Sequence, residues 1–228
     1  MTVRALRRGS IAASRVTSVP FTLNAPTLRE ELVSSSGGTS VTIGPITPAA
    51  NALVLVWAAA SGAAAAPSSM TGWGITFTRV AFYFDAGFAY GLALFAGSAA
   101  SPTTGTGSFN LVGGSNGWGY RVEDWTGSST PTVRQVKNSP APASASTAAI
   151  TLDTPPQASS AAVGLFLKQG NTTLFTAGSD FTAGLNAGYT TPTTTIFTEY
   201  DIGPADGAVD CTFSSAFWAG IAAEIGAP

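Results

Sequence analysis

The sequence predicts an all-β protein, a two-sheet antiparallel β-sandwich of jelly-roll type with an extended N-terminal arm. Short runs rich in Val, Ile, Thr, Phe, Tyr and Trp recur between clusters of Gly, Pro, Asn and Ser, which is the pattern of short strands joined by turns. No segment after the arm shows sustained helical periodicity. The third observation is a charge asymmetry, because the first fifteen residues hold four arginines and no acid.

The expected strands run from residue 39 to residue 225. The clearest are Thr39–Ile43, Ala52–Ala59, Ile75–Phe84, Tyr90–Ala96, Ser108–Val112, Gly119–Trp125, Thr132–Val136, Ala148–Leu152, Ala161–Lys168, Thr194–Ile202, Ala208–Phe213 and Phe217–Ile225. Some alternate between apolar and polar residues, as half-buried strands do. Others, such as Leu53–Trp57 and Val163–Leu167, are continuously apolar, which suits the packed inner layer of a sandwich. Many strands without a helix favour two packed sheets that protect their edges.

The domain organisation expected is a basic arm, residues 1–38, followed by one sandwich domain, residues 39–228. The arm ends in the Ser- and Gly-rich run of residues 34–38, which indicates a flexible join. The Pro- and Ser-rich run of residues 138–147 is interpreted as a connection between two strands. A chain of 228 residues can bury a core large enough to need no disulfide or metal, and the single Cys211 agrees.

Charge is scarce and unevenly placed. The chain has 10 Lys and Arg against 12 Asp and Glu, and Arg4, Arg7, Arg8 and Arg15 carry four of the positive charges. The arm is therefore basic and the rest of the chain is acidic. Such an arm can bind nucleic acid, an anionic surface or an acidic face of a neighbouring subunit. It lacks interleaved aromatic residues, which argues against nucleic acid, and we predict that these four arginines form an assembly arm.

Because the charge is low, copies of the protein repel one another little at long range, which is compatible with a subunit of an assembly. A codon bias toward Ala, Gly and Thr is an equally simple explanation. No secretion signal or membrane span is expected. The longest uncharged run near the N-terminus, residues 9–14, is too short for a signal. Residues 51–69 are mostly Ala and are interrupted by Gly62 and Pro67.

The residue inventory excludes several kinds of chemistry. The sequence has no histidine, which removes Ser–His and Cys–His catalysis and histidine-based zinc sites. One cysteine removes all-thiolate zinc and iron–sulfur sites. The glycine-rich run of residues 113–117 lacks the lysine of a phosphate-binding loop. We expect no enzyme activity, no catalytic residue, no cofactor and no metal.

Carboxylate pairs are the remaining route to hydrolysis. Glu199 and Asp201 lie two apart on an expected strand and project from one face, as in sandwich-fold glycosidases that have a third acid where this chain has Pro204. Without that acid the strand cannot supply both groups, so solvent-facing carboxylates are the preferred interpretation. Asp201, Asp206 and Asp210 could meet around a turn and hold a cation, although calcium usually needs more ligands.

Three tryptophans are candidates for contact with a glycan. Trp73 and Trp118 are flanked by glycine and turn residues, and Trp125 follows the acids Glu123 and Asp124. An aromatic face can stack on a sugar ring while carboxylates bond its hydroxyls. A tryptophan on a strand is more often part of a core, and this alternative is strongest for Trp125.

Four segments carry a resemblance to a known group. They are Asn51–Trp57, Gly72–Val80, Tyr120–Gly127 and Phe217–Ala223. Together they resemble a β-sandwich domain common in tailed-phage and prophage structural proteins, over residues 39–227. Phe77 stands where that group has a tryptophan. The resemblance implies a jelly-roll or lectin-like sandwich in a minor tail, fibre or capsid-surface protein.

The function expected is therefore that of a structural protein of a tailed bacteriophage virion, located in the virion and acting by contact with other virion proteins. A homo-oligomer is expected, with a trimer as one option. No nucleic-acid or membrane partner is expected. The alternative function is a carbohydrate-binding module that recognises a host glycan, and a third is a glycosidase.

Overall fold

The structure is a computed structural model that describes residues 20–62, 65–140, 143–203 and 207–228. Its regular structure is entirely antiparallel β, so the predicted all-β sandwich class is confirmed. The described ranges contain no helix that could cross a membrane. The strands are β1 (Thr27–Ser34), β2 (Gly38–Ile46), β3 (Leu53–Ser61), β4 (Ala66–Gly72), β5 (Ile75–Thr76), β6 (Thr78–Asp85), β7 (Tyr90–Gly97), β8 (Gly105–Ser115), β9 (Gly117–Trp125), β10 (Thr132–Asn138), β11 (Ala143–Thr151), β12 (Ala161–Gln169), β13 (Thr176–Ala177), β14 (Thr182–Thr190), β15 (Thr193–Ile202) and β16 (Ala208–Gly226).

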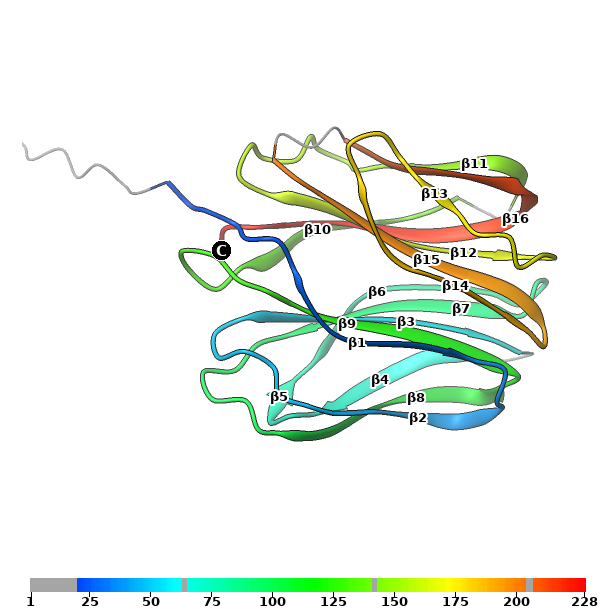
Figure 1. Ribbon diagram of the computed structural model, residues 1–228, viewed down its shortest axis with the longest axis horizontal. Helices are drawn as coiled ribbons and strands as arrows, with labels where there is room; N and C mark the ends of the chain where they lie inside the picture. The colour runs from blue at the N-terminus through cyan, green and yellow to red at the C-terminus, as the bar shows by residue number, and fades with distance from the viewer. Residues whose placement is uncertain (1–19, 63–64, 141–142, 204–206) are drawn as a thin grey trace, which may run out of the picture.

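These strands stack in four layers (Figure 1). One outer layer is the sheet β2-β8-β4-β5, and beside it lies the inner sheet β1-β9-β3-β7-β6. The second inner sheet is β10-β16-β12-β15-β14. The long strand β16 takes part in two layers. Its first half pairs with β11 and β13 in the other outer layer, and its second half pairs with β10 and β12.

The first half of the chain has the nested strand pairing of a jelly roll. Its first strand, β1, pairs with its last, β9, and the next pairs inward are β2 with β8 and β3 with β7. The hairpin of β4 and β5 lies at the centre of the nest. This order closes the half into a two-sheet sandwich.

The second half repeats this pairing. There β10 pairs with the end of β16, β11 with its beginning and β12 with β15. The orders of the two inner sheets match position by position, and in the outer layers β2-β8-β4 matches β11-β16-β13, with no described counterpart of β5. The predicted two-sheet sandwich therefore occurs twice, and the expectation of one sandwich over residues 39–228 gives way to two halves that meet near residue 129.

Short matches in sequence mark the repeat. Residues 26–30 read Pro-Thr-Leu-Arg-Glu and residues 131–135 read Pro-Thr-Val-Arg-Gln, each at the start of the first strand of a half. Gly62 and Gly170 directly follow the third strands, and both have positive φ, at 143° and 101°. A side chain is strained there, so the same turn has the same requirement in both halves.

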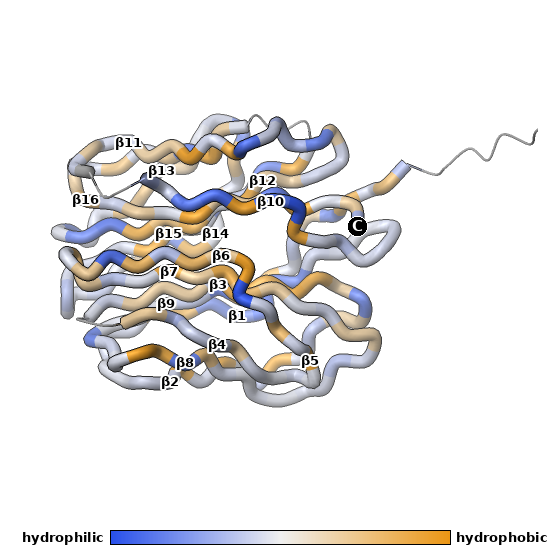
Figure 2. The backbone as a smooth tube through the Cα atoms, turned by 180° about the vertical axis from the view of Figure 1, so that it is seen from behind, coloured by the Kyte–Doolittle hydropathy of each residue, from blue (hydrophilic) through white to orange (hydrophobic). Residues whose placement is uncertain are grey.

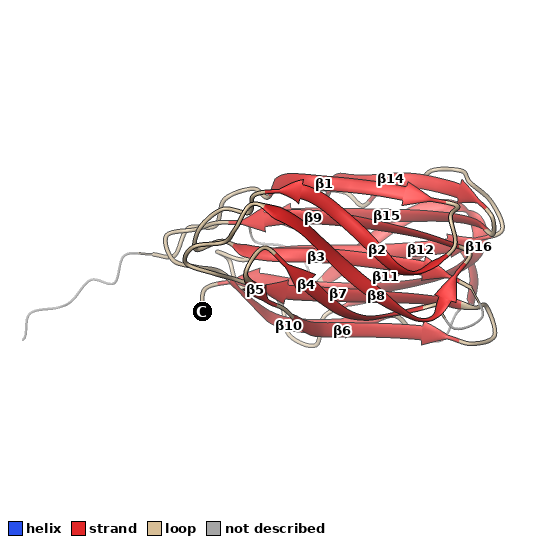
Figure 3. Cartoon of the chain, turned by 90° about the horizontal axis from the view of Figure 1, so that it is seen from below, coloured by secondary structure: helices blue, strands red, loops and turns tan. Residues whose placement is uncertain are grey.

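The halves pack through their inner sheets in opposite strand order. The edge strand β1 contacts β14, and β10 contacts β6 (Figure 3). The first strand of each half thus lies over the same edge of the other half, which is the arrangement of a local two-fold axis. A dimer with an isologous interface has this geometry, but here one chain contains both units.

Three apolar cores separate the four layers. The central core lies between the inner sheets and includes Leu55, Trp57, Leu165 and Ile221. The other two lie between each inner sheet and its outer layer. Every residue of β3 is buried, because side chains of alternate residues enter different cores. This confirms the inner-layer interpretation of the run of residues 53–57.

The arm boundary differs from the expectation. Residues 27–34, assigned to the arm by sequence, form the edge strand β1 and pair with β9. Leu23 also forms an isolated bridge with Gly127. Residues 20–38 therefore belong to the body. Arg4, Arg7, Arg8 and Arg15 lie outside the described residues.

Candidate functional site

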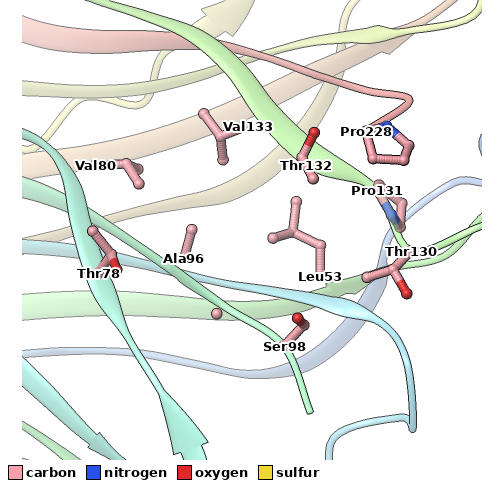
Figure 4. Close-up of a pocket in the computed structure, with 11 residues that line it drawn as sticks. Leu53, Thr78, Val80, Ala96, Ser98, Thr130, Pro131, Thr132, Val133 and Pro228 are labelled. Atoms are coloured by element: carbon pink, nitrogen blue, oxygen red, sulfur yellow. The ribbon is translucent and has the colours of Figure 1, made fainter. Parts of the chain in front are cut away.

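An apolar groove opens between the two halves, where β6 of the first faces β10 of the second. Its volume is about 520 Å³. In Figure 4, Val80 and Ala96 of the first half lie on one side of the groove, and Val133 and Pro131 of the second half lie on the other. No lining residue carries a charged side chain. The lining consists of Leu53, Thr78, Val80, Ala96, Gly97, Ser98, Thr130, Pro131, Thr132, Val133 and Pro228.

The groove continues along the seam between the two edge strands. A second hollow of about 230 Å³ shares Val80 and Val133 with the first. Beyond it the amide of Asn138 on β10 donates to the carbonyl of Phe82 on β6 at 2.8 Å. Figure 2, viewed from behind, shows an apolar stretch of β6 beside this seam, whereas β10 alternates between apolar and hydrophilic residues. The groove is thus bounded by apolar and uncharged polar side chains, and its continuation along the seam also includes Arg134 and Gln135.

Two of the tryptophans predicted to contact a glycan are enclosed in cores. Trp73 is 2% exposed and its indole N–H donates to the carbonyl of Gly105 at 2.9 Å. Its backbone has φ 56°, and its ring packs over Gly107, where a Cβ would lie 2.6 Å from the ring. Trp125 is fully buried. Neither ring presents a face to solvent, so the structure does not support these two as glycan contacts.

Trp118 keeps a partly exposed ring. It lies on β9 and stacks on Tyr120, with ring centroids 5.9 Å apart and an interplanar angle of 13°. The hydroxyl of Tyr120 donates to Glu30 at 2.9 Å. One face of the indole is thus covered by protein. Of the three candidates, only Trp118 retains surface for a ligand.

Glu123 is the centre of a buried polar network in the central core. Its Oε1 accepts hydrogen bonds from the indole N–H groups of Trp57, at 3.1 Å, and Trp125, at 2.9 Å. Its Oε2 accepts from the Nε of Arg121 at 2.8 Å. Arg121 also pairs with Glu31 on β1. Every contact serves the interior, because a buried charge must be paired and hydrogen-bonded.

Asp124 closes one end of the first half. Its Oδ2 accepts a hydrogen bond from the backbone N–H of Ala49 at 2.6 Å and is paired with Arg29 at 2.6 Å. Burial raises the pKa of Asp124 against the lowering effect of these two donors. The carboxylate thereby fastens the edge strand β1 and the loop before β3 to the last strand, β9.

Glu224 has the same task in the second half. Its Oε1 accepts from the backbone N–H of Gln157 at 2.9 Å and from the hydroxyl of Ser160 at 2.6 Å. Arg134 lies 3.5 Å away. Burial acts to raise the pKa of Glu224, but these donors and the amide of Gln135 lower it overall. No sequence motif marks either Asp124 or Glu224. Their similar roles became apparent only from the structural repeat.

Glu199, predicted as a solvent-facing carboxylate, is 2% exposed. It lies in the core beneath the second outer layer, where its Oε2 accepts from the N–H of Gly178 at 3.2 Å. Its Oε1 has no hydrogen-bond partner among the described residues. Burial, with a contribution from the charge of Asp210, raises the pKa of Glu199 to about 8. The expected position on the surface is therefore wrong.

The acids proposed as cation ligands do not form a described site. Asp206 lies outside the described residues, and within them no three acidic or thiol groups gather in a way that could hold a metal. Cys211 is buried near Glu199, and burial raises the pKa of its thiol.

Lys168 is a buried cation that the sequence did not single out. Its Nζ donates to the hydroxyl of Thr173 at 2.7 Å and lies 4.9 Å from the centre of the Phe175 ring. Burial lowers the pKa of its amine. Aromatic faces stabilise a desolvated cation, so this lysine is held by the protein interior. A polar residue at the end of an apolar run, Val163–Leu167, was the only signal for it.

The groove also escaped sequence reasoning, because it is formed by residues of both halves. The signal that could have found it is the pair of Pro-Thr-x-Arg matches, which places Thr132 and Val133 on a first strand like β1. Comparison of the chain with models of known protein families, with curated proteins and with solved structures gives no match.

Proposed function

We propose that the protein is a structural subunit of a tailed-phage virion that acts by contact with neighbouring subunits in the particle. Two observations together carry the proposal. An apolar groove opens at the surface, and the buried carboxylates described above are engaged in contacts inside the protein. A contact protein needs an apolar surface for its partner, and the seam between β6 and β10 supplies one. The resemblance of residues 39–227 to phage structural domains supports the choice of a virion.

The edge strand β1 adds a second apolar surface. Leu28 and Leu32 on this strand are 45% and 48% exposed. One edge of β1 pairs with β9, and β1 is the last strand of its sheet on the other side. A strand edge of this kind can pair with another chain. The body therefore offers two kinds of assembly contact, and the basic residues 1–19 supply a third.

The test is incorporation of a shortened protein into particles. Deletion of residues 1–19 leaves every described contact in place, so the variant should fold with an unchanged melting temperature and fail to enter particles. A matched control is full-length protein with Arg4, Arg7, Arg8 and Arg15 replaced by Lys, which keeps the charge and should be incorporated. Normal incorporation of the deletion variant would contradict the anchoring role of the arm.

A further inference from the structure

The seam between the halves has two mouths in equivalent places. Each lies where the third strand of one half, β3 or β12, begins and the strand paired with it, β7 or β15, ends. The chain that leads into the first strand of the other half lies opposite. At the first mouth, residues 158–159 and 202–203 face residues 21–23. At the second, the start of β3 and the end of β7 face residues 130–133, and this is the apolar groove.

The first mouth is filled by an apolar segment of the chain itself. Leu23 is 9% exposed and belongs to the central core, with Phe21 packed beside it. The segment is extended and is held by backbone hydrogen bonds from Asn24 to Thr126 and from Ser128 to Thr22, both of 2.9 Å. The hollow that remains there is about 250 Å³. The protein thus shows which kind of segment fits such a mouth.

The second mouth has no equivalent segment. When Pro26 is matched with Pro131, Thr126 and Ser128 fall on the positions of Phe21 and Leu23. Both are polar, and both already hold the segment at the first mouth. The linker between the halves therefore cannot fill the second mouth, which explains why its hollow is about 520 Å³.

We propose that this groove binds the N-terminal arm of a second copy of the chain. The uncharged run of residues 9–14 enters as an extended segment, and Ile11 takes the position that Leu23 has at the first mouth. No side chain that lines the groove is charged, so burial there of the arginine-rich parts of the arm would be costly. Arg8 and Arg15 flank the run and stay at the rim. This inference rests on the proposed assembly function and names the partner.

A second copy fits the path of the chain better than the arm of the same molecule. Traced backward from β1, the described chain passes beyond the end of the sheet beside residues 126–128 and leaves the body (Figure 1). The segment points away from the body where it leaves it (Figure 1 and Figure 3), so a return to the groove would require a reversal of chain direction, whereas a neighbour meets the arm directly.

Disulfide trapping between two full-length variants tests the proposal. One variant carries Ile11→Cys and the other Thr78→Cys, at an exposed position that lines the groove. Mild oxidation of the mixture should give a cross-linked heterodimer at least tenfold above the yield with Thr71→Cys, an exposed control on β4. Cys211 can remain, because it is buried. Adding Val80→Trp to the Thr78→Cys chain should fill the groove and abolish the cross-link.

The outcomes are distinct. Equal yields from Thr78→Cys and Thr71→Cys, or a cross-link that persists with Val80→Trp, would overturn the proposal. So would a cross-link that forms only within a single chain carrying both cysteines, because the arm would then fold back on its own body. Particle incorporation is measured separately, so loss of incorporation without groove cross-linking would overturn the groove contact and leave the virion role intact.

Discussion

Three buried glutamates show how neighbours decide the behaviour of a carboxyl group. Glu123 accepts hydrogen bonds from two indoles and a guanidinium, and Glu224 accepts from a backbone N–H and a hydroxyl. Glu199 has one backbone donor for two oxygens. Hydrogen bonds lower the pKa of Glu224 overall, whereas burial raises the pKa of Glu199, which has few donors. Glu199 therefore belongs to the neutral interior.

Replacement of this group by an uncharged analogue should change how stability depends on pH. Burial raises the pKa of Glu199 from 4.5 to about 8. Its contribution to stability is then complete below pH 4.5 and is lost as the pH rises to 8, since the unfolded chain releases the proton first. Glu199→Gln should raise the free energy of unfolding at pH 8.5 by roughly 2–4 kcal/mol. Urea denaturation at pH 5 and pH 8.5 measures this.

A matched control for that measurement is Asp153→Asn. Asp153 is mostly exposed and pairs with Lys137 at the surface. Its replacement should leave the pH dependence of unfolding as it is in the parent protein, because exposed pairs contribute little. If Glu199→Gln and the parent protein lose stability equally between pH 5 and pH 8.5, the interpretation of Glu199 as a buried neutral acid is wrong.

Loss of Glu123 should have the opposite effect on stability. Glu123→Ala leaves Arg121 and the two indole N–H groups without their acceptor in the central core. Breaking a buried pair in this way costs about 3–5 kcal/mol, measured as the free energy of unfolding in urea. Glu31→Ala removes the more exposed partner of Arg121 and should cost about 1 kcal/mol or less. Similar losses for the two variants would contradict the central role of Glu123.

Single elements differ in how well the sequence predicts them, and the number of covered faces explains the difference. Strands β3 and β12 are buried on both faces, so their continuous apolar runs were recognised. In the edge strand β1, three charged residues separate Leu28 from Leu32. The segment therefore lacks the alternation of apolar and polar residues by which a strand is recognised. Strand β14 is mostly small or polar residues and gave no signal.

Two other elements were misread at their ends. The expected strand over residues 75–84 is interrupted at Phe77, because β5 belongs to an outer sheet and β6 to an inner one. The two strands expected between residues 208 and 225 are one long strand, β16, shared by two layers. Passage from one sheet to another is a tertiary property, since a change of layer has no local pattern of its own.

The edge strand β1 should matter more for folding than the rest of the N-terminal region. A chain beginning at residue 35 loses β1, the apolar segment at the first mouth and the ion pairs of Arg29 and Glu31. Its melting temperature should fall by at least about 10 °C, since each kcal/mol lost lowers it by about 2–4 °C in a protein of this size. Circular dichroism of both chains measures this. A chain beginning at residue 20 is the control and should melt like the full protein.

At the scale of the whole molecule, the fold class was predictable but the duplication was not. Equivalent positions in the two halves hold different side chains, as Trp57 and Leu165 do in the central core. A sandwich tolerates such changes while volume and apolar pattern are kept. The sequence retains the Pro-Thr-x-Arg matches and a turn glycine in both halves. The arginines form ion pairs with Asp124 and Glu224, and the glycines are required by the positive φ of the turn.

The two halves should behave as an associated pair even when the chain joining them is cut. The central core holds residues of both inner sheets, whereas one covalent link near the exposed Ser129 connects the halves. With a protease site inserted between Ser129 and Thr130, the cleaved protein should elute in size-exclusion chromatography as one species of unchanged size. Urea should separate the fragments.

The control for the cut protein is a charge placed in the shared core. Leu165 is 1% exposed and lies in the central core, so Leu165→Asp buries an unpaired carboxyl that costs several kcal/mol. Cleaved protein with this change should dissociate without urea. If the cleaved parent instead separates into two folded monomers, each half is complete alone, and the central core is a contact between independent domains. Persistent association would mean that each half completes the other, as two subunits of an isologous dimer do.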